Sequence, residues 1–229
     1  MIPELIVLLT HNDQTVSNAF EVFAGCHDLP IANWGFKNNG IPKHEMRKLV
    51  TSLKSKGKTT FFEVVTYDEE SCMTAAKFAY ECGFDYLIGT LYFPRVWEFI
   101  KTKPIKYYPF VGDVKGIPSI LTGSSENIAL QAEELYSEKN THGVNILAFR
   151  YQDGSPEKLA KRVVDKTKSN TIVAGGIDSV ERIKAVNFIQ PWGFTIGSAL
   201  FTGRFAPGRG YRANLEEVLS LMDSFGSAA

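Results

Sequence analysis

"NTIVAGGIDSVERIKAV" (Asn170–Val186) is followed a few residues later by "WGFTIGSALFTGRF" (Trp192–Phe205). Each stretch begins with a short apolar run, reaches a glycine turn and continues into residues with helical character. Runs that are apolar throughout, instead of alternating with polar residues, are typical of parallel strands covered on both faces. The two stretches therefore predict consecutive strand–turn–helix units of an α/β protein, with two glycine turns at the same end of neighbouring strands.

The same alternation of apolar runs and amphipathic stretches extends along the whole chain. The expected strands are ELIVLLT (4–10), PIANWGF (30–36), TTFFEVVTY (59–67), FDYLIGTLY (84–92), IKYYPFVG (105–112), GVNILAFRY (143–151), TIVAGG (171–176) and WGFTIGSAL (192–200). Eight units of about 25 to 30 residues match the size of a βα unit. We therefore predict a single (β/α)8 barrel, one domain over residues 1–229. The alternative, an open doubly wound sheet, would place GxGxxG after the first strand, where this chain reads THNDQT (10–15).

Composition narrows the function classes. Lys plus Arg and Asp plus Glu both total 25, so the formal net charge is zero. Nucleic-acid binding needs a clustered cationic excess, which this balance disfavours. The N-terminus has no basic lead before its short apolar run, and no segment reaches the length of a membrane span. The three cysteines form no CxxC pair and suggest a reducing compartment. We expect a cytoplasmic protein without nucleic-acid or membrane partners, and a homo-oligomer is compatible with the sequence.

In a barrel of this kind, functional residues follow the carboxyl ends of the strands. Glycine lets a backbone approach a ligand closely, and free N–H groups at a helix start favour an anion. The loops after the last two strands often bind phosphate. We therefore expect a phosphate site at Gly175, Gly176, Gly197 and Ser198. The alternative is that these glycines only permit tight turns.

The final quarter of the chain also resembles a known family. "IVAGGIDSVERIKAV…GFTIGSALFTGRF" is similar to the ribulose-phosphate-binding barrels, and most similar to the phosphoribosyl isomerases of histidine synthesis; "FDYLIGT" resembles their fourth strand. The resemblance implies phosphate binding at the two glycine turns and a second phosphate turn, partly matched by Gly89 and Thr90. The partner glycines expected after the third strand are missing, since the chain reads FFEVVTY (61–67) there. A substrate with one phosphate therefore fits better than a bisphosphate.

The same resemblance implies an acid and a base on aspartates that end the first and fifth strands, where this chain has Asp13 and Asp113. Two such carboxylates can move protons at neighbouring sugar carbons if their surroundings separate their pKa values. Asp13 follows its strand by about three residues, later than in the family, and Asp28 and Asp153 are nearby alternatives. Both aspartates of the pair are equally consistent with turn or helix-capping roles.

Other polar residues at strand ends are further candidates. Glu63 lies inside the apolar strand FFEVV, so it either faces the barrel mouth as a catalytic group or pairs with a cation such as Lys37 or Arg150. Those two cations are expected to bind substrate, or to form ion pairs. The remaining candidates are Lys115, which raises an aldolase alternative through a Schiff base, and His11, which is either a proton shuttle or a loop residue.

These residues predict a barrel that binds a small phosphorylated sugar or sugar-like metabolite and catalyses isomerisation, epimerisation or a related lyase step. The alternative is a phosphate-ligand-binding barrel without catalysis, a sensor or partner subunit. The four histidines show neither HxH nor HExxH spacing, so we expect no metal and no cofactor. The segment TGRFAPGRGYR (202–212) is expected to be either a connector or a lid that brings Arg204 or Arg209 to a phosphate.

Overall fold

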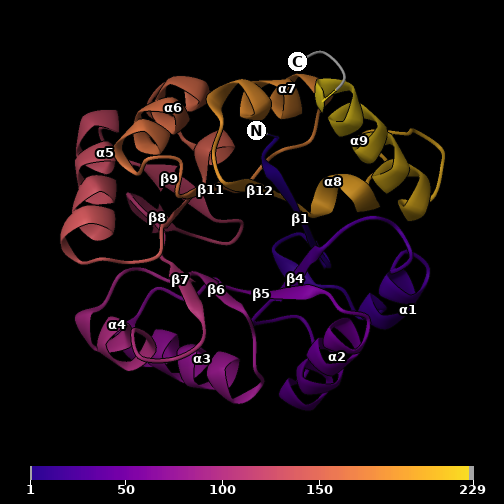
Figure 1. Cartoon of the computed structure of the whole chain (residues 1–229), viewed down its shortest axis with the longest axis horizontal. Helices are drawn as coiled ribbons and strands as arrows, with labels where there is room; N and C mark the ends of the chain where they lie inside the picture. The colour runs from indigo at the N-terminus through magenta and orange to yellow at the C-terminus, as the bar shows by residue number, and fades with distance from the viewer. Residues whose placement is uncertain (1, 227–229) are drawn as a thin grey trace.

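The computed structural model describes residues 2–226, which form a single α/β barrel (Figure 1). Its eight parallel strands lie in the order β10-β11-β12-β1-β4-β5-β6-β7. Their bounds are β1 Glu4–Leu8, β4 Asn33–Lys37, β5 Thr59–Val64, β6 Tyr86–Gly89, β7 Lys106–Tyr108, β10 Val144–Ile146, β11 Thr171–Val173 and β12 Gly193–Ile196. Seven of the barrel strands lie within the predicted apolar runs, and β4 extends its run by one residue to Lys37, so the predicted barrel is confirmed.

A narrow seam between β7 and β10 closes the ring. Phe110 and Asn145 form an isolated parallel bridge there. The Asn145 N–H donates to the carbonyl of Pro109 at 2.8 Å, and the Val111 N–H donates to the carbonyl of Asn145 at 3.1 Å. By contrast, five residues of β4 pair in register with β5. The seam is therefore paired over fewer residues than β4 and β5 are.

Two antiparallel hairpins extend from the carboxyl ends of the barrel strands. The first consists of β2 (Thr10–His11) and β3 (Gln14–Thr15), directly after β1. The second consists of β8 (Asp113–Lys115) and β9 (Ile120–Thr122), after β7. The apolar runs predict neither hairpin, since the first run ends at Thr10 and the fifth ends at Gly112, before β8 begins. Both carry residues that were expected in the site.

Helices cover the outside of the strand ring (Figure 1). The helical segments are α1 Ala19–Ala24, α2 Lys43–Ser55, α3 Glu69–Glu81, α4 Pro94–Ile100, α5 Ser125–Glu133 with the π-helical turn η1 Glu134–Glu138, the 3-10 turn η2 Ala148–Arg150, α6 Pro156–Lys166, α7 Val180–Ile189, α8 Ser198–Phe201 and α9 Tyr211–Gly226; η2 and α8 lie at the barrel mouth. The burial of Met46, Leu49, Val50 and Leu53 follows the 3–4 residue spacing of a helix face that packs against a sheet. None of the helices within residues 2–226 has the length and apolarity that a membrane span requires.

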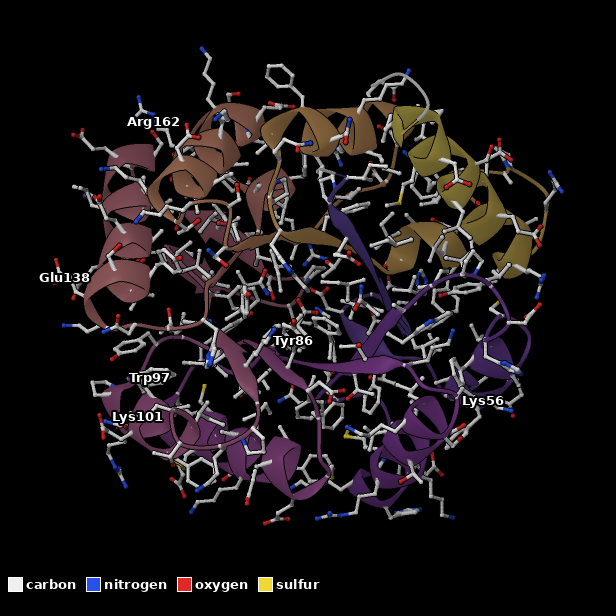
Figure 2. The ribbon with its side chains drawn as sticks, in the orientation of Figure 1. Lys56, Tyr86, Trp97, Lys101, Glu138 and Arg162 are labelled. Atoms are coloured by element: carbon white, nitrogen blue, oxygen red, sulfur yellow. The ribbon has the colours of Figure 1, made fainter. Side chains whose placement is uncertain are left out.

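The barrel interior has an aromatic end and a polar end. Phe61 stacks on Tyr86 with ring centroids 4.2 Å apart, and Tyr86 stacks on Trp192 at 5.3 Å. Figure 2 shows Tyr86 inside the ring, whereas Trp97 and Arg162 lie on the surrounding helices. These rings fill the barrel towards the amino ends of the strands, because Trp192 directly precedes β12 and Tyr86 begins β6. Only the opposite end is left to form a ligand site.

The end of the sixth strand corrects one local prediction. This strand ends at Ile146, so Arg150 lies in the 3-10 turn η2 and not at the end of a strand. Ser179 is the N-cap of α7, and its side chain accepts from the N–H of Arg182. Asp68 caps α3 by accepting from the N–H of Ser71, and Pro42 is the N-cap of α2.

Candidate functional site

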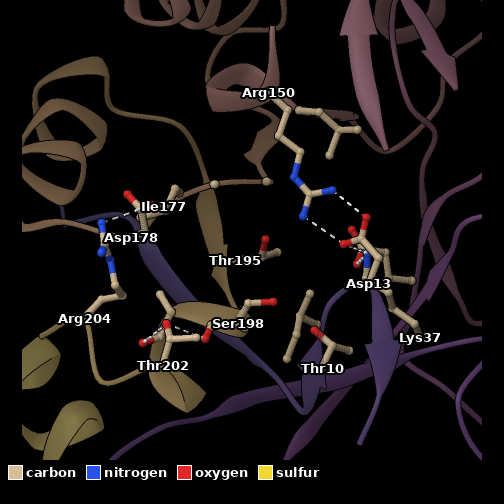
Figure 3. Close-up of a pocket in the computed structure, with 17 residues that line it drawn as sticks. Thr10, Asp13, Lys37, Arg150, Ile177, Asp178, Thr195, Ser198, Thr202 and Arg204 are labelled. Carbon is tan, nitrogen blue, oxygen red and sulfur yellow. Dashed lines mark hydrogen bonds and ion pairs between the residues drawn. The ribbon is translucent and has the colours of Figure 1, made fainter. Parts of the chain in front are cut away.

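A cavity of about 500 Å³ opens at the carboxyl ends of the strands (Figure 3). Its lining comprises Leu8, Thr10, Asp13, Lys37, Glu63, Leu147, Arg150, Gly175, Gly176, Ile177, Asp178, Thr195, Gly197, Ser198, Ala199, Thr202 and Arg204. The cavity thus brings together eight of the residues expected in the site: Asp13, Lys37, Glu63, Arg150, Gly175, Gly176, Gly197 and Ser198. They come from six strand ends or the turns that follow them, as expected for a barrel site.

Four charged side chains of alternating sign form a chain along one side of this cavity. Arg150 binds both carboxylate oxygens of Asp13, with Nη1–Oδ2 at 2.6 Å and Nη2–Oδ1 at 2.8 Å. Lys37 Nζ lies 3.1 Å from Asp13 Oδ1 and 3.0 Å from Glu63 Oε2. Asp13, Lys37 and Glu63 are buried, and Arg150 is about three-quarters buried. Two cations balance two anions, so the chain carries no formal net charge.

The β2–β3 hairpin explains how Asp13 reaches the barrel mouth despite its distance from β1. Its two central residues, Asn12 and Asp13, have φ angles of 48° and 59°. Two consecutive residues with positive φ are typical of a type I′ turn, whose twist matches that of the flanking strands. The Asn12 N–H donates to Ser198 Oγ at 3.1 Å, which ties the turn to α8. The hairpin therefore holds Asp13 over Lys37 without extending β1.

Asp13 is held as an ionised carboxylate by its partners. Burial opposes ionisation, but the Arg150 hydrogen bonds, the nearby charge of Lys37 and the Ser119 N–H, 2.9 Å from Oδ2, together hold the pKa of Asp13 well below its usual range. Burial also disfavours the charged form of Arg150, but hydrogen bonding to Asp13 raises its pKa. A carboxylate with four donors and a lowered pKa is a weak base, so these surroundings suit Asp13 to positioning Arg150 and Lys37.

Glu63 has a simpler environment than Asp13. The structure pairs it with Lys37, one of the two arrangements expected for a carboxylate inside this strand. The contact is an ion pair at 3.0 Å without hydrogen-bond alignment, since Oε2 has no hydrogen-bond partner among the described residues. Glu63 also lines the cavity. Of the two carboxylates in the charged chain, Glu63 is therefore the less restrained and the better placed to exchange a proton with a ligand.

The glycine turns have both a packing role and free backbone donors. A Cβ on Gly175 would lie 3.0 Å from Arg150 Cδ, and one on Gly197 would lie 2.6 Å from Thr10 Oγ1. Gly175 and Gly176 each have φ of +74°, which disfavours any side chain. Among residues 2–226, no hydrogen-bond acceptor is found for the N–H groups of Gly176, Ser198 or Ala199. The turns thus line the cavity with unused donors.

At the turn of Gly89 and Thr90, expected from the family resemblance to hold a second phosphate, both donors of Thr90 are already used within the protein. The Thr90 N–H donates to the carbonyl of Val64 at 2.9 Å, and the Thr90 hydroxyl bonds the Tyr107 hydroxyl at 2.7 Å. Thr90 is completely buried. Thr90 is therefore bonded to residues of both neighbouring strands, β5 and β7, and does not offer its N–H or hydroxyl to a ligand.

Three expected site residues lie outside the cavity lining. Asp113 and Lys115 are exposed on the β8–β9 hairpin, because the chain leaves the barrel after β7 and the side chains of β8 on that face point to solvent. His11 packs against Phe201, with ring centroids 5.9 Å apart. The expected pairing of Asp13 with Asp113 across the substrate is therefore not assembled. The alternatives Asp28 and Asp153 are also engaged elsewhere, with Arg212 and with the Gly123 N–H.

The cavity also contains residues that the sequence did not indicate. Thr10, Thr195 and Thr202 add hydroxyl groups, and Asp178 adds a carboxylate. Asp178 is neutralised by Arg182 at 2.8 Å and approached by Arg204 at 3.8 Å. Isolated threonines in apolar strands give no signal in a single sequence, because they are also common packing residues. Arg204 lines the cavity from the 202–212 segment, consistent with one of the two interpretations of that segment.

Possible metal ligands are not clustered in the part of the chain that the structure describes, where no group of three His, Cys, Asp or Glu side chains could hold an ion.

Comparisons with known proteins show the fold and no more. No protein-family model and no curated protein matches the chain. Among solved structures, orotidine 5′-phosphate decarboxylase from Pyrococcus horikoshii OT3 is similar over 96% of this chain and 97% of its own, with a TM-score of 0.67 and 13% identity. A structure described as native KDPGal is similar over 98% of this chain and 95% of its own, with a TM-score of 0.63 and 13% identity. The glycerol uptake operon antiterminator regulatory protein from Listeria monocytogenes str. 4b F2365 is similar over 85% of this chain and 91% of its own. Its TM-score is 0.58 and its sequence identity is 14%.

At such identities the likeness shows the barrel fold alone. The three proteins are described in different terms, as a decarboxylase, as KDPGal and as an antiterminator regulatory protein. Because one fold hosts many functions, the function must be argued from the site.

Proposed function

We propose that the cavity binds a small phosphorylated sugar or sugar-like metabolite and catalyses an acid–base isomerisation, epimerisation or related lyase step. The observation that carries this proposal is the presence, in one cavity, of the charged chain Arg150–Asp13–Lys37–Glu63 and the free N–H groups of the two glycine turns. Resemblance to the phosphoribosyl isomerases supports the phosphate end of the proposal, as does the name of the decarboxylase of the same fold, which specifies a 5′-phosphate.

The phosphate would lie against the N–H groups of Gly176, Ser198 and Ala199. Backbone donors beside glycines accommodate phosphate oxygens at close range, and Arg204 is near enough to add a positive charge. Asp178 also lies on that side of the cavity (Figure 3), and its two arginine neighbours offset its charge. Phosphate binding would anchor the substrate and orient its other end towards the charged chain.

At the reacting end, Glu63 would accept the proton from carbon and Lys37 would stabilise the oxygen that becomes negative in an enediolate. Two carboxylates hold the Lys37 ammonium group at the cavity, where it would donate a hydrogen bond to that oxygen. Asp13 would hold Lys37 and Arg150 in place. This assignment replaces the proton exchange between Asp13 and Asp113 with one between substrate and Glu63, since Asp113 does not line the cavity.

A second candidate, a binding barrel without catalysis, is favoured by one observation. The aspartate pair that the family resemblance implies for proton transfer is not assembled, because Asp13 is saturated with donors and Asp113 is exposed. In that case the free N–H groups would still bind a phosphate ester, and the charged chain would serve only to order the barrel mouth.

Solvent deuterium exchange separates the two candidates. The protein is mixed in D2O with a panel of pentose and hexose phosphates, and deuterium uptake at carbon is followed by NMR. An enzyme is expected to exchange at least one carbon-bound proton, and Glu63→Gln is expected to reduce that rate by about 10²–10⁴-fold, the usual contribution of a general base. Binding of the esters without exchange across the panel would favour the second candidate.

Asp113→Asn serves as the matched control, since it also replaces one carboxylate by an amide but lies on the exposed hairpin. It is expected to retain the exchange rate. Loss of exchange in Asp113→Asn with retention in Glu63→Gln would contradict the roles assigned to these two residues. Circular dichroism and denaturant unfolding establish that each variant is folded before its rate is interpreted.

A further inference from the structure

We infer that the cavity selects a non-aromatic, hydroxylated ligand with a single phosphate and discriminates against nucleotides and bisphosphates. This inference rests on the proposed phosphate site and specifies which phosphate esters it accepts. It departs both from the isomerase family that the sequence resembles and from the fold neighbour whose name specifies orotidine. Three features of the cavity carry it: the absence of rings, the closure of the second turn, and a line of hydroxyl groups.

The first feature is the chemical character of the cavity wall. Within residues 2–226, no aromatic or histidine side chain lines it. The barrel's own rings are used elsewhere, with Phe61, Tyr86 and Trp192 stacked on each other away from the mouth. A nucleobase gains about 1–3 kcal/mol by stacking on an aromatic side chain. Here that contribution is missing, so a base attached to the ligand would add size without a ring to stack on.

Arg150 is a cation that could replace a ring by stacking on a base, but its guanidinium is already bonded to Asp13 and Ser119. Both of its terminal nitrogens bond Asp13, and Nη1 also donates to the carbonyl of Ser119 at 3.1 Å. A Cβ added to Gly175 would lie only 3.0 Å from Arg150 Cδ, which shows that the arginine stem packs closely on that turn. The cavity volume of about 500 Å³ would admit a nucleotide, so the discrimination comes from the lining and not from size.

The second feature concerns the number of phosphate groups. Free N–H donors are found at Gly176, Ser198 and Ala199, all on the side of the cavity formed by the turns after β11 and β12. Across the barrel, the Thr90 N–H and hydroxyl are both bonded within the protein and fully buried. A second phosphate would instead approach the charged chain, where Glu63 and Asp13 are anions. One phosphate can be satisfied, and a second has no comparable donors.

The third feature is the group of hydroxyls between the two ends of the cavity. Figure 3 shows Thr195 between the Arg150–Asp13 pair and Ser198. Thr195 is buried and lines the cavity, and its hydroxyl has no hydrogen-bond partner among the described residues. The hydroxyl of Thr10 is likewise without a partner there. Such groups match the hydroxyls of a polyol carbon chain, which joins a phosphate at one end to the Lys37–Glu63 pair at the other.

Titration calorimetry with four probes tests this inference: inorganic phosphate, ribulose 5-phosphate, ribulose 1,5-bisphosphate and uridine 5′-monophosphate. Ribulose 5-phosphate is expected to bind at least tenfold more tightly than inorganic phosphate. The nucleotide is expected to gain little over inorganic phosphate, and the bisphosphate is expected to bind more weakly than ribulose 5-phosphate. A nucleotide or bisphosphate that binds as tightly as ribulose 5-phosphate, or more tightly, would overturn the inference and leave the phosphate site intact.

Thr195→Val separates hydroxyl recognition from phosphate binding, because it removes the hydroxyl and keeps the shape of the side chain. It is expected to weaken ribulose 5-phosphate by about threefold to tenfold, the value of one neutral hydrogen bond, and to leave inorganic phosphate unchanged. Thr51→Val, on the exposed face of α2, is the control. Equal affinity for ribulose 5-phosphate in both variants would refute the role of Thr195. Failure of all four probes to bind would refute the proposed phosphate site, and the inference with it.

Discussion

Asp13 shows how one buried carboxylate can organise a whole site. Its two oxygens accept from Arg150, Lys37 and the Ser119 N–H, so three segments that are distant in sequence meet at one residue. Removing a partner from a buried ion pair is far more costly than the pair's net contribution, because it leaves the other charge unpaired. Asp13 is therefore expected to matter for stability independently of any role in catalysis.

The lowered pKa of Asp13 predicts a specific dependence of stability on pH. A carboxyl whose pKa is lower in the folded than in the unfolded protein stabilises the fold above the unfolded pKa of about 3.9, and this contribution is lost as pH falls towards the folded pKa. At pH 7 we expect Asp13→Asn to lower the free energy of unfolding by about 3–5 kcal/mol. Urea unfolding between pH 7 and pH 3 should show this difference constant down to about pH 5 and smaller below it.

Asp28→Asn provides the comparison for that experiment. Asp28 pairs with Arg212 on the surface, and hydrogen bonding to this arginine lowers the pKa of Asp28 to about 2. Because exposed ion pairs contribute little, this variant should lose much less stability than Asp13→Asn at every pH. Equal losses in the two variants, or an Asp13→Asn difference that grows as the pH falls, would contradict the assigned environment of Asp13.

At the scale of the element, the β2–β3 hairpin is the feature that the sequence pattern missed. The apolar run 4–10 predicted a strand followed by a loop, and the position of Asp13 three residues later made its role doubtful. The structure resolves this with a two-residue turn in which Asn12 and Asp13 adopt positive φ. Asn and Asp tolerate this conformation better than other non-glycine residues, but an Asn-Asp pair is a weaker turn signal than Asn-Gly.

Substitutions at Asn12 test whether the turn conformation positions the site. Asn12→Gly should change the free energy of unfolding by only a few tenths of a kcal/mol, whereas Asn12→Val should lower it by about 1–2 kcal/mol, because a β-branched residue is strained at a φ of 48°. Both keep the backbone N–H that donates to Ser198. Chemical denaturation measures the difference, with Asn127→Val in the exposed first turn of α5 as the control. Equal stability of the Gly and Val variants at position 12 would argue against this turn.

At the scale of the molecule, the sequence predicted the barrel well and the site in part. Eight apolar runs of similar spacing determine the strand order, because short βα units leave few other topologies. Strand ends then predicted Lys37, Glu63 and Arg150 in the cavity. The sequence could not predict which loops turn outward. The segment after β7 forms a second hairpin that exposes Asp113 and Lys115, and nothing in the local pattern distinguishes it from a loop that folds over the mouth.

The seam between β7 and β10 leads to a prediction about how the barrel opens. Hydrogen bonds from Asn145 to Pro109 and from Val111 to Asn145 close the ring there, whereas β4 and β5 pair over five residues. Local opening requires less free energy where fewer hydrogen bonds must break together. In native-state hydrogen exchange, the amides of Val111 and Asn145 should therefore exchange faster than those of residues 61–63 and depend less on denaturant. If all these amides exchange only by global unfolding, the seam is as stable as the rest of the barrel, and the narrow pairing is compensated by side-chain packing around it.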